Sequence, residues 1–269
     1  MSSLRSRILT AVVLGALLVA LLLFAAPLLA GLVLGLIMLI GAWEWSALVR
    51  LRSLAARSAY VLLLAVAALL GQRCFAGTAA FTQLMQLVLL WWLLALLWVA
   101  LAPQQASQLG AALAGLLALV PAWLALVRIA GSWARGGEWA LFILMIAFAA
   151  DTGAFFAGHR FGRLRLAPRV SPGKTWEGVI GGMLAAAVVG YAGALWFAQP
   201  PQAFVPLCLG AAALSVVGDL TESLLKRRAG LKDSGRLFPG HGGVLDRIDS
   251  VTSAAPAMAA GLIWLGVGQ

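Results

Sequence analysis

The longest uncharged stretch of this chain limits its fold more than any other feature. No residue from Cys74 to Val127 is charged, and a second uncharged run extends from Gly178 to Gly218. Apolar runs of about 18 or more residues are long enough to cross the hydrocarbon core of a bilayer as an α-helix. The runs do not alternate apolar with polar residues, as the strands of an outer-membrane barrel do. We therefore predict an all-α polytopic integral membrane protein.

The composition agrees with this class, because 63% of the residues are apolar and only 10% are charged, against about 25% in an average soluble domain. We predict about nine transmembrane helices, of which the third is the shortest. The predicted spans are 8–26, 27–43, 60–72, 84–101, 109–127, 139–157, 178–198, 204–220 and 251–268. A cleaved signal peptide is an alternative for the first span, but this span is longer than a usual signal core and the second follows it without a charge.

The basic residues predict the orientation of these spans. With a cytoplasmic N-terminus, nine crossings place the loops 49–58, 158–177 and 221–250 on the cytoplasmic side. These loops and the N-terminus hold sixteen of the nineteen Lys and Arg residues, and cytoplasmic loops carry such an excess. We expect a multi-pass protein of the cytoplasmic (inner) membrane, and the same excess explains the net charge of +10 without a nucleic-acid partner. Anionic headgroups or an anionic substrate would suit that charge equally well.

Eleven of the chain's twenty-eight charged residues fall within the polar segment, which we define as Asp219–Ser250. If the eighth helix continues past the membrane edge, Asp219, Glu222 and Lys226 share one of its faces.

The carboxylates of Asp246 and Asp249 repeat this spacing where the ninth helix would begin. Mg²⁺ takes oxygen ligands and keeps waters for substrate phosphates, so these carboxylates, with Asp219 and Glu222, form a candidate metal site that leaves room for a second cation. Acidic residues that simply solvate helix ends are the alternative.

A glycine-rich stretch, Pro239–Gly243, lies between the two carboxylate pairs. Gly240, Gly242 and Gly243 allow backbone N–H groups to approach an anion. His241 could carry a proton, and phosphate recognition or loop structure is equally consistent with its position. Basic residues around this stretch suit phosphate oxygens; they are Lys226, Arg227, Arg228, Lys232 and Arg236.

The loop 158–177 contains Gly173-Lys174-Thr175, which invites comparison with a phosphate-binding P-loop. The comparison fails because Pro168 occupies the position of the first glycine and no strand is expected before it. Lys174 remains a candidate phosphate contact at the start of a helix.

Two further patterns concern the membrane interior. Asp151 lies well inside the sixth span, and a charge there costs about 2.5–3.5 kcal/mol, so we expect it to face a cavity or to pair with an arginine. Small residues recur at every fourth position of the seventh span, and such a stripe allows another helix to approach closely, within the bundle or across a dimer. They are Gly178, Gly182, Ala186, Gly190 and Ala194.

The polar residues therefore comprise carboxylates, cations and glycine-rich backbone, without a Ser-His-Asp order, a Cys-His pair or an HExxH helix. This inventory is typical of phosphoryl or nucleotidyl transfer, which requires positioning and charge neutralisation more than a covalent nucleophile.

The polar segment resembles the signature of the phosphatidate cytidylyltransferases, also called CDP-diacylglycerol synthases. The stretches Ser171–Gly178 and Asp151–Ala154 resemble two further stretches of that family, so the resemblance covers about residues 150–250. The first half of the chain matches only in its hydrophobic spans. The signature positions are Ser223, Lys226, Arg227, Lys232, Asp233, Pro239, His241, Gly242, Gly243, Asp246, Arg247 and Asp249.

This resemblance implies a dimeric, all-helical membrane enzyme that converts CTP and phosphatidic acid into CDP-diacylglycerol and pyrophosphate with Mg²⁺. It implies that Asp219, Asp246 and Asp249 bind the metal, with Asp246 foremost, and Glu222 is the fourth candidate ligand. We expect Asp219, Lys226 and Asp246 to be catalytic. The residues that we expect to contact substrates are Ser171, Lys174, Arg227, Lys232, His241, Gly242, Gly243 and Arg247.

On this basis residues 1–138 form a membrane scaffold with oligomer contacts, and residues 139–269 form the catalytic region. A transporter that uses Asp151 and Asp219 is an alternative, but it would require paired broken helices or an internal repeat, which the sequence does not show. A CDP-alcohol phosphatidyltransferase is a second alternative, and its D-G-x-x-A-R stretch is absent.

Overall fold

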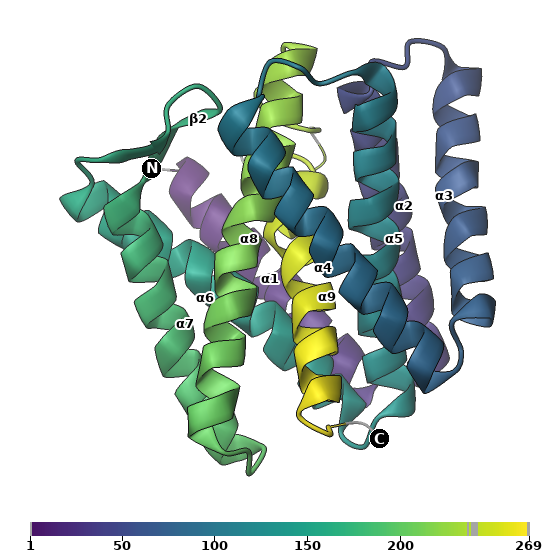
Figure 1. The fold of residues 1–269 in the computed structure, drawn as a ribbon, viewed down its shortest axis with the longest axis vertical. Coiled ribbons are helices and arrows are strands. Elements are labelled where there is room, and N and C mark those ends of the chain that lie inside the picture. The colour runs from purple at the N-terminus through teal and green to yellow at the C-terminus, as the bar shows by residue number, and fades with distance from the viewer. Residues whose placement is uncertain (1, 236, 238–241, 268–269) are drawn as a thin grey trace.

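The computed structural model describes residues 2–235, 237 and 242–267, with side chains from residue 12 onward. Within these residues the chain forms nine helices and one two-stranded sheet (Figure 1). In order they are α1 (Ser2–Phe24), α2 (Pro27–Leu48), α3 (Leu54–Cys74), α4 (Thr78–Leu101), α5 (Gln108–Ser132), α6 (Gly136–Phe161), β1 (Arg165–Ala167), β2 (Ser171–Thr175), α7 (Trp176–Trp196), α8 (Pro201–Ala229) and α9 (Leu245–Trp264).

Seven of these helices, α2 to α8, are long and apolar enough to cross a membrane. The third span, predicted as the shortest, is a full helix of 21 residues. The predicted all-α polytopic fold is therefore confirmed. Successive helices run in alternate directions, so the α2–α3, α6–α7 and α8–α9 connections lie at the same end of the bundle (Figure 1). We call this end the polar end.

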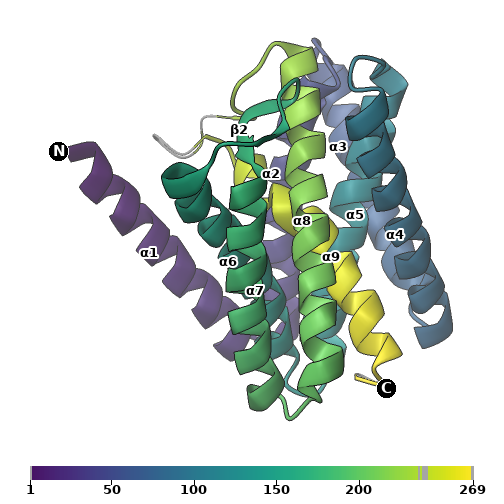
Figure 2. The same cartoon turned by 60° about the vertical axis from the view of Figure 1, so that its left-hand side comes forward.

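Helix α1 differs from the other helices because it slants away from the bundle toward its N-terminus (Figure 2). Its apolar part among the residues with described side chains, Val12–Phe24, is shorter than the other spans.

Helix α9 lies in the interior of the bundle, beside α8 and α5 (Figures 1 and 2). It begins at Leu245, six residues before the predicted span. Its first turns can carry polar residues because they contact other helices and not lipid. Its hydroxyl groups bond to backbone carbonyls: Thr252 Oγ1 donates to Asp249 O at 2.5 Å, and Ser253 Oγ donates to Leu214 O at 2.7 Å. These bonds satisfy polar groups that lipid could not satisfy.

The small residues of α7 allow α6 to approach it closely. A Cβ atom built at Gly182 would lie 2.6 Å from the carbonyl oxygen of Ala150, and one at Gly178 would lie 3.0 Å from that of Ala154. All five small residues of the predicted stripe are buried. The interpretation that this stripe packs within the chain's own bundle is therefore confirmed, and the stripe does not provide a dimer surface.

The connection between α6 and α7 is not the open loop that we predicted. Strands β1 and β2 pair antiparallel, with Arg165 opposite Thr175 and Ala167 opposite Ser171. The expectation that no strand comes before Pro168 is wrong, because β1 ends at Ala167, directly before it. The three residues of the Gly-Lys-Thr sequence end β2. The motif still does not form a P-loop, since it lies within a hairpin strand.

Candidate active site

A cavity of about 650 Å³ opens between α6, α7, α8, the first turns of α9 and the hairpin. One part of its lining is charged, and the lining includes Asp151, Arg165, Lys174, Asp219, Asp246, Arg247 and Asp249. The other part is apolar, and it includes Ala150, Ala154, Phe155, Val179, Met183, Ala212 and Val216. The cavity therefore presents charged and apolar surfaces side by side at the polar end of the bundle.

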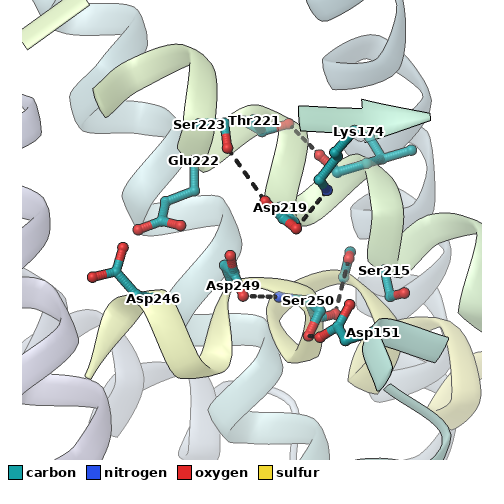
Figure 3. A network of polar contacts seen from close by, with 12 residues as sticks. Asp151, Lys174, Ser215, Asp219, Thr221, Glu222, Ser223, Asp246, Asp249 and Ser250 are labelled. Atoms are coloured by element: carbon teal, nitrogen blue, oxygen red, sulfur yellow. Dashed lines mark hydrogen bonds and ion pairs between the residues drawn. The ribbon is translucent and has the colours of Figure 1, made fainter. Parts of the chain in front are cut away.

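Lys174 and Asp219 form an ion pair inside this cavity (Figure 3). Lys174 lies on β2, and Asp219 lies on α8. The Asp219 carboxylate also accepts a hydrogen bond of 3.3 Å from Ser223 Oγ, one turn further along the same helix. Both side chains of the ion pair remain about one quarter exposed, at 24% and 25%, so substrate atoms can reach them.

The hairpin holds Lys174 in this place through its two ends. Thr175 Oγ1 accepts a hydrogen bond of 3.1 Å from Gly178 N and so caps the first turn of α7. Trp176 N donates to Leu164 O at 2.9 Å, while Leu164 N donates to the Glu177 carboxylate at 3.1 and 3.2 Å. Lys174, which directly precedes the capping residue Thr175, is therefore held between the end of β2 and the start of α7.

A second lysine, Lys226, lies between two carboxylates. Its Nζ atom is 2.9 Å from Glu222 Oε2 and 2.7 Å from Asp246 Oδ1, and its side chain is only 12% exposed. The predicted continuation of α8 beyond the span is confirmed, because this helix extends to Ala229. The continuation brings Glu222 and Lys226 to the first turn of α9.

Both oxygens of Asp246 are already occupied by donors from the protein. Besides Lys226, the Ser234 N–H donates to both oxygens at 3.2 and 3.0 Å, and the Gly243 N–H donates to Oδ2 at 2.8 Å. Burial raises the pKa of Asp246, but Lys226 and the Gly243 N–H lower it by more, so the carboxyl's pKa lies below its usual range. Asp246 is therefore ionised at neutral pH.

Three further carboxylates face the same region between α8 and α9 (Figure 3). Glu222 is 1% exposed, and its Oε1 atom has no hydrogen-bond partner among the described residues. Asp249 accepts a hydrogen bond of 2.8 Å from Ser250 N, and Asp151 accepts one of 2.7 Å from Ser250 Oγ. The prediction that Asp151 faces a cavity is confirmed, because it lines this one.

The predicted site residues therefore separate into groups. Asp219 with Lys174, and Asp246 with Lys226 and Glu222, are brought together, while Asp249 and Arg247 line the same cavity. Gly243 contributes its N–H to Asp246, and Gly242 adopts a φ of 81°, which favours glycine.

The remaining predicted substrate contacts lie outside this arrangement. Arg227 and Lys232 are exposed and do not line the cavity, and neither does Ser171 on β2. His241 lies outside the described residues, as do Arg236, Pro239 and Gly240.

Sequence reasoning missed Glu44 and Ser234. Glu44, near the end of α2, is only 6% exposed and accepts hydrogen bonds from Ser234, Val244 and Leu245. One sequence signal could have identified it: Glu44 is the only acidic residue before Glu138, and it directly follows the predicted span 27–43, which ends on the same side as the polar segment.

The donor set suits a hard divalent cation, although the carboxylates do not form a closed ligand cage. Among the described residues, no three acidic, His or Cys side chains surround one point closely enough to hold a metal. Mg²⁺ commonly takes one or two carboxylates and completes its shell with water and substrate phosphates. Asp219 and Asp249, which line the cavity, fit such a role.

Fold and site together define a polytopic membrane protein with a charged cavity suited to phosphates, and comparison with known proteins identifies the family. The family model described as "Cytidylyltransferase family" matches residues 5–264. This chain belongs to the cytidylyltransferase family, as the resemblance in its polar segment implied. The match over almost the whole chain favours this family over the transporter and phosphatidyltransferase alternatives.

Individual relatives agree with this assignment. A phosphatidate cytidylyltransferase from Pseudomonas aeruginosa is 41% identical over 239 residues, which cover 86% of each chain. A protein of the same name from Haemophilus influenzae is 40% identical over 279 residues, covering 94% of this chain and 96% of its own length. A third from Thermotoga maritima is 41% identical over 128 residues, or 45% of this chain and 47% of its own.

Proposed function

We propose that this protein transfers a cytidylyl group from CTP to phosphatidic acid, giving CDP-diacylglycerol and pyrophosphate in phospholipid biosynthesis. The observation that carries the proposal is the cavity with adjoining charged and apolar walls. A substrate with a phosphate headgroup and acyl chains suits both kinds of surface. The names of the two nearly full-length relatives support the same substrates.

In the proposed reaction, an oxygen of the lipid phosphate attacks the α-phosphorus of CTP. The bond from that phosphorus to the oxygen bridging it to the β-phosphate breaks in line, and pyrophosphate leaves with the bonding electrons. The nucleophile is already ionised at neutral pH, so the chain's main tasks are to align two anions and to offset their repulsion.

Lys174 is the cation best placed for these tasks. It reaches the cavity from the hairpin and pairs with one partly exposed carboxylate, that of Asp219. A phosphate oxygen can therefore bind the Lys174 ammonium group in place of this carboxylate or together with it. Arg247 lines the same cavity and adds positive charge there. Lys226 offsets the negative charge of the buried Glu222 and Asp246 carboxylates.

We propose that Asp219 and Asp249, two expected ligands that line the cavity, would hold Mg²⁺ together with water and substrate phosphates. Glu222, the fourth candidate ligand, does not line the cavity. When bound, the ion supplies positive charge that neutralises the phosphates and the leaving pyrophosphate. Asp246 was the foremost expected ligand, but its two oxygens already accept four hydrogen bonds from the protein. Positioning of Lys226, Ser234 and Gly243 is its better-supported role.

We infer that the polar end faces the cytoplasm, where CTP is available, and that the protein lies in the inner membrane. The excess of Lys and Arg in the loops at this end supports the orientation. The homodimer implied by the resemblance stays a prediction.

The proposal is tested with purified protein in liposomes containing phosphatidic acid, supplied with CTP labelled at the α-phosphate. We expect labelled CDP-diacylglycerol and pyrophosphate in equal amounts, no lipid product when diacylglycerol replaces phosphatidic acid, and loss of product after chelation that added Mg²⁺ reverses. Asp219→Asn and Asp246→Asn should both abolish product formation in correctly inserted protein. Absence of labelled lipid with every divalent cation would overturn the function, and full activity in chelator would overturn the metal assignment.

A further inference from the structure

Glu44 connects the N-terminal half of the chain to the polar segment through three hydrogen bonds. Its Oε2 atom accepts from Ser234 Oγ at 3.0 Å and from Leu245 N at 2.8 Å, and its Oε1 atom accepts from Val244 N at 3.1 Å. The partners lie 190 to 201 residues further along the chain. No other residue of α2 has such a set of polar contacts among the described side chains.

These contacts satisfy the first turn of α9, which has no cap of its own. Val244 occupies the cap position and has no side-chain oxygen to offer the free N–H groups. A carboxylate at a helix N-terminus is favoured both by these donors and by the helix dipole. Glu44 therefore supplies from α2 the cap that the sequence of α9 lacks.

The backbone around Glu44 leaves no room for larger residues. A Cβ atom built at Gly235 or at Gly243 would lie less than 2.5 Å from an oxygen of the Glu44 carboxylate. Glycine at these two places thus allows the backbone to close around the charge, and the carboxylate is only 6% exposed.

Glu44 and Asp246 both bind Ser234 and the residues where α9 begins. Glu44 binds Ser234 and the Val244–Leu245 turn, whereas Asp246 binds the N–H groups of Ser234 and Gly243. Asp246 in turn holds Lys226. A shift of Glu44 is therefore transmitted through one hydrogen-bonded residue to the carboxylate and the lysine of the site.

We propose that Glu44 is a positioning residue for cytidylyl transfer: its carboxylate fixes Ser234 and the start of α9, and thereby sets the positions of Asp246 and Lys226. The inference rests on the proposed function. It implies that the active site requires Glu44, a residue of the region 1–138 that we predicted to be a membrane scaffold. Glutamine has a similar size, but its NH₂ group would face backbone donors where an oxygen is needed.

The first experiment compares Glu44→Gln with Glu138→Gln, a matched glutamate at the opposite end of α6 from the cavity. Removal of an outer partner of a site typically costs about 10–100-fold in activity. We expect Glu44→Gln to lower kcat by that factor with nearly unchanged KM values for CTP and phosphatidic acid, and Glu44→Asp to restore part of the loss. The control should retain its kcat. A kcat of Glu44→Gln within about twofold of the unmodified chain would overturn the inference.

A second experiment separates positioning from a general loss of stability. Ser234→Ala removes one Glu44 contact without a change in charge, so it should lower kcat less than Glu44→Gln does. In the double variant we expect no further loss beyond that of Glu44→Gln, because both changes break the same connection. Losses that multiply would overturn the inference, even if Glu44→Gln proves poorly folded. An inactive unmodified chain would instead show that the proposed function is wrong.

Discussion

Two lysines of the site, Lys226 and Lys174, are each paired with an aspartate, yet their surroundings differ. Lys226 is 12% exposed and lies between Glu222 and Asp246, the second of which also accepts backbone N–H groups. Lys174 is 24% exposed and has a single carboxylate partner, Asp219, on another element.

This difference indicates that Lys226 keeps its carboxylate partners, whereas Lys174 can exchange its partner for a substrate phosphate. Breaking the contacts of Lys226 would leave two buried carboxylates without a cation, so its arrangement is part of the folded structure. The Lys174 pair is partly solvated, and such pairs contribute little to stability, about 0–1 kcal/mol. The protein can therefore exchange Asp219 for a substrate phosphate at Lys174 at small cost, while Lys226 keeps the cavity wall in place.

The largest effect is expected from Lys226→Met. Removing one partner of a buried ion pair typically costs about 3–5 kcal/mol, because Glu222 and Asp246 would lose the cation that offsets their charges. We expect a correspondingly lower midpoint of thermal unfolding in detergent, together with loss of activity. Lys226→Met combined with Glu222→Leu should recover a large part of the stability. An unchanged midpoint for the single variant would contradict the structural role that we assign to Lys226.

A smaller effect, and one on activity alone, is expected from Lys174→Met. Loss of one charged donor that faces the reacting phosphates typically lowers kcat by about 10²–10³-fold, and the thermal midpoint should shift little. Arg169→Met is the matched control, since Arg169 is exposed in the same hairpin and does not line the cavity. If both hairpin variants lost equal activity, general positive charge rather than Lys174 would be responsible.

The smallest effect is expected from Gly182→Leu, which pushes α7 away from α6. Overpacking of a close contact typically costs about 1–3 kcal/mol, and the Cβ atom would lie 2.6 Å from Ala150 O. Because α7 carries the hairpin, activity should fall through Lys174 while the Lys226 contacts persist. Gly210→Leu, on α8 with open space around it, is the control to compare by thermal unfolding and by kcat. Equal losses in the two variants would show that helix packing does not set the position of Lys174.

The sequence was sufficient for the membrane-spanning fold and for the local order of charges. Helical spacing correctly placed Glu222 and Lys226 on an extended α8 and Asp246 at the start of α9, because residues three or four apart share a helix face whatever lies around them. Asp249 was placed in the same helix for the same reason.

Contacts between distant segments could not be predicted in this way. The partners of Glu44 are about two hundred residues away, and only the three-dimensional arrangement of α2 and α9 brings them together. The hairpin was missed because β1 has three residues and β2 has five, too few to show an alternating pattern. The division of roles between Lys174 and Lys226 depends on exposure, which their residue type does not reveal.

The buried position of α9 has a consequence for the order in which the protein is assembled. This helix follows eight others within the described residues, and its serines, threonines and carboxylates are poorly suited to contact with lipid. We therefore expect the earlier helices to reach their final packing only when α9 is in place, and the first turn of α9 must reach Glu44 before the site is complete. A nascent chain interrupted before α9 would lack Asp246, so we expect the proposed activity to require synthesis of this helix.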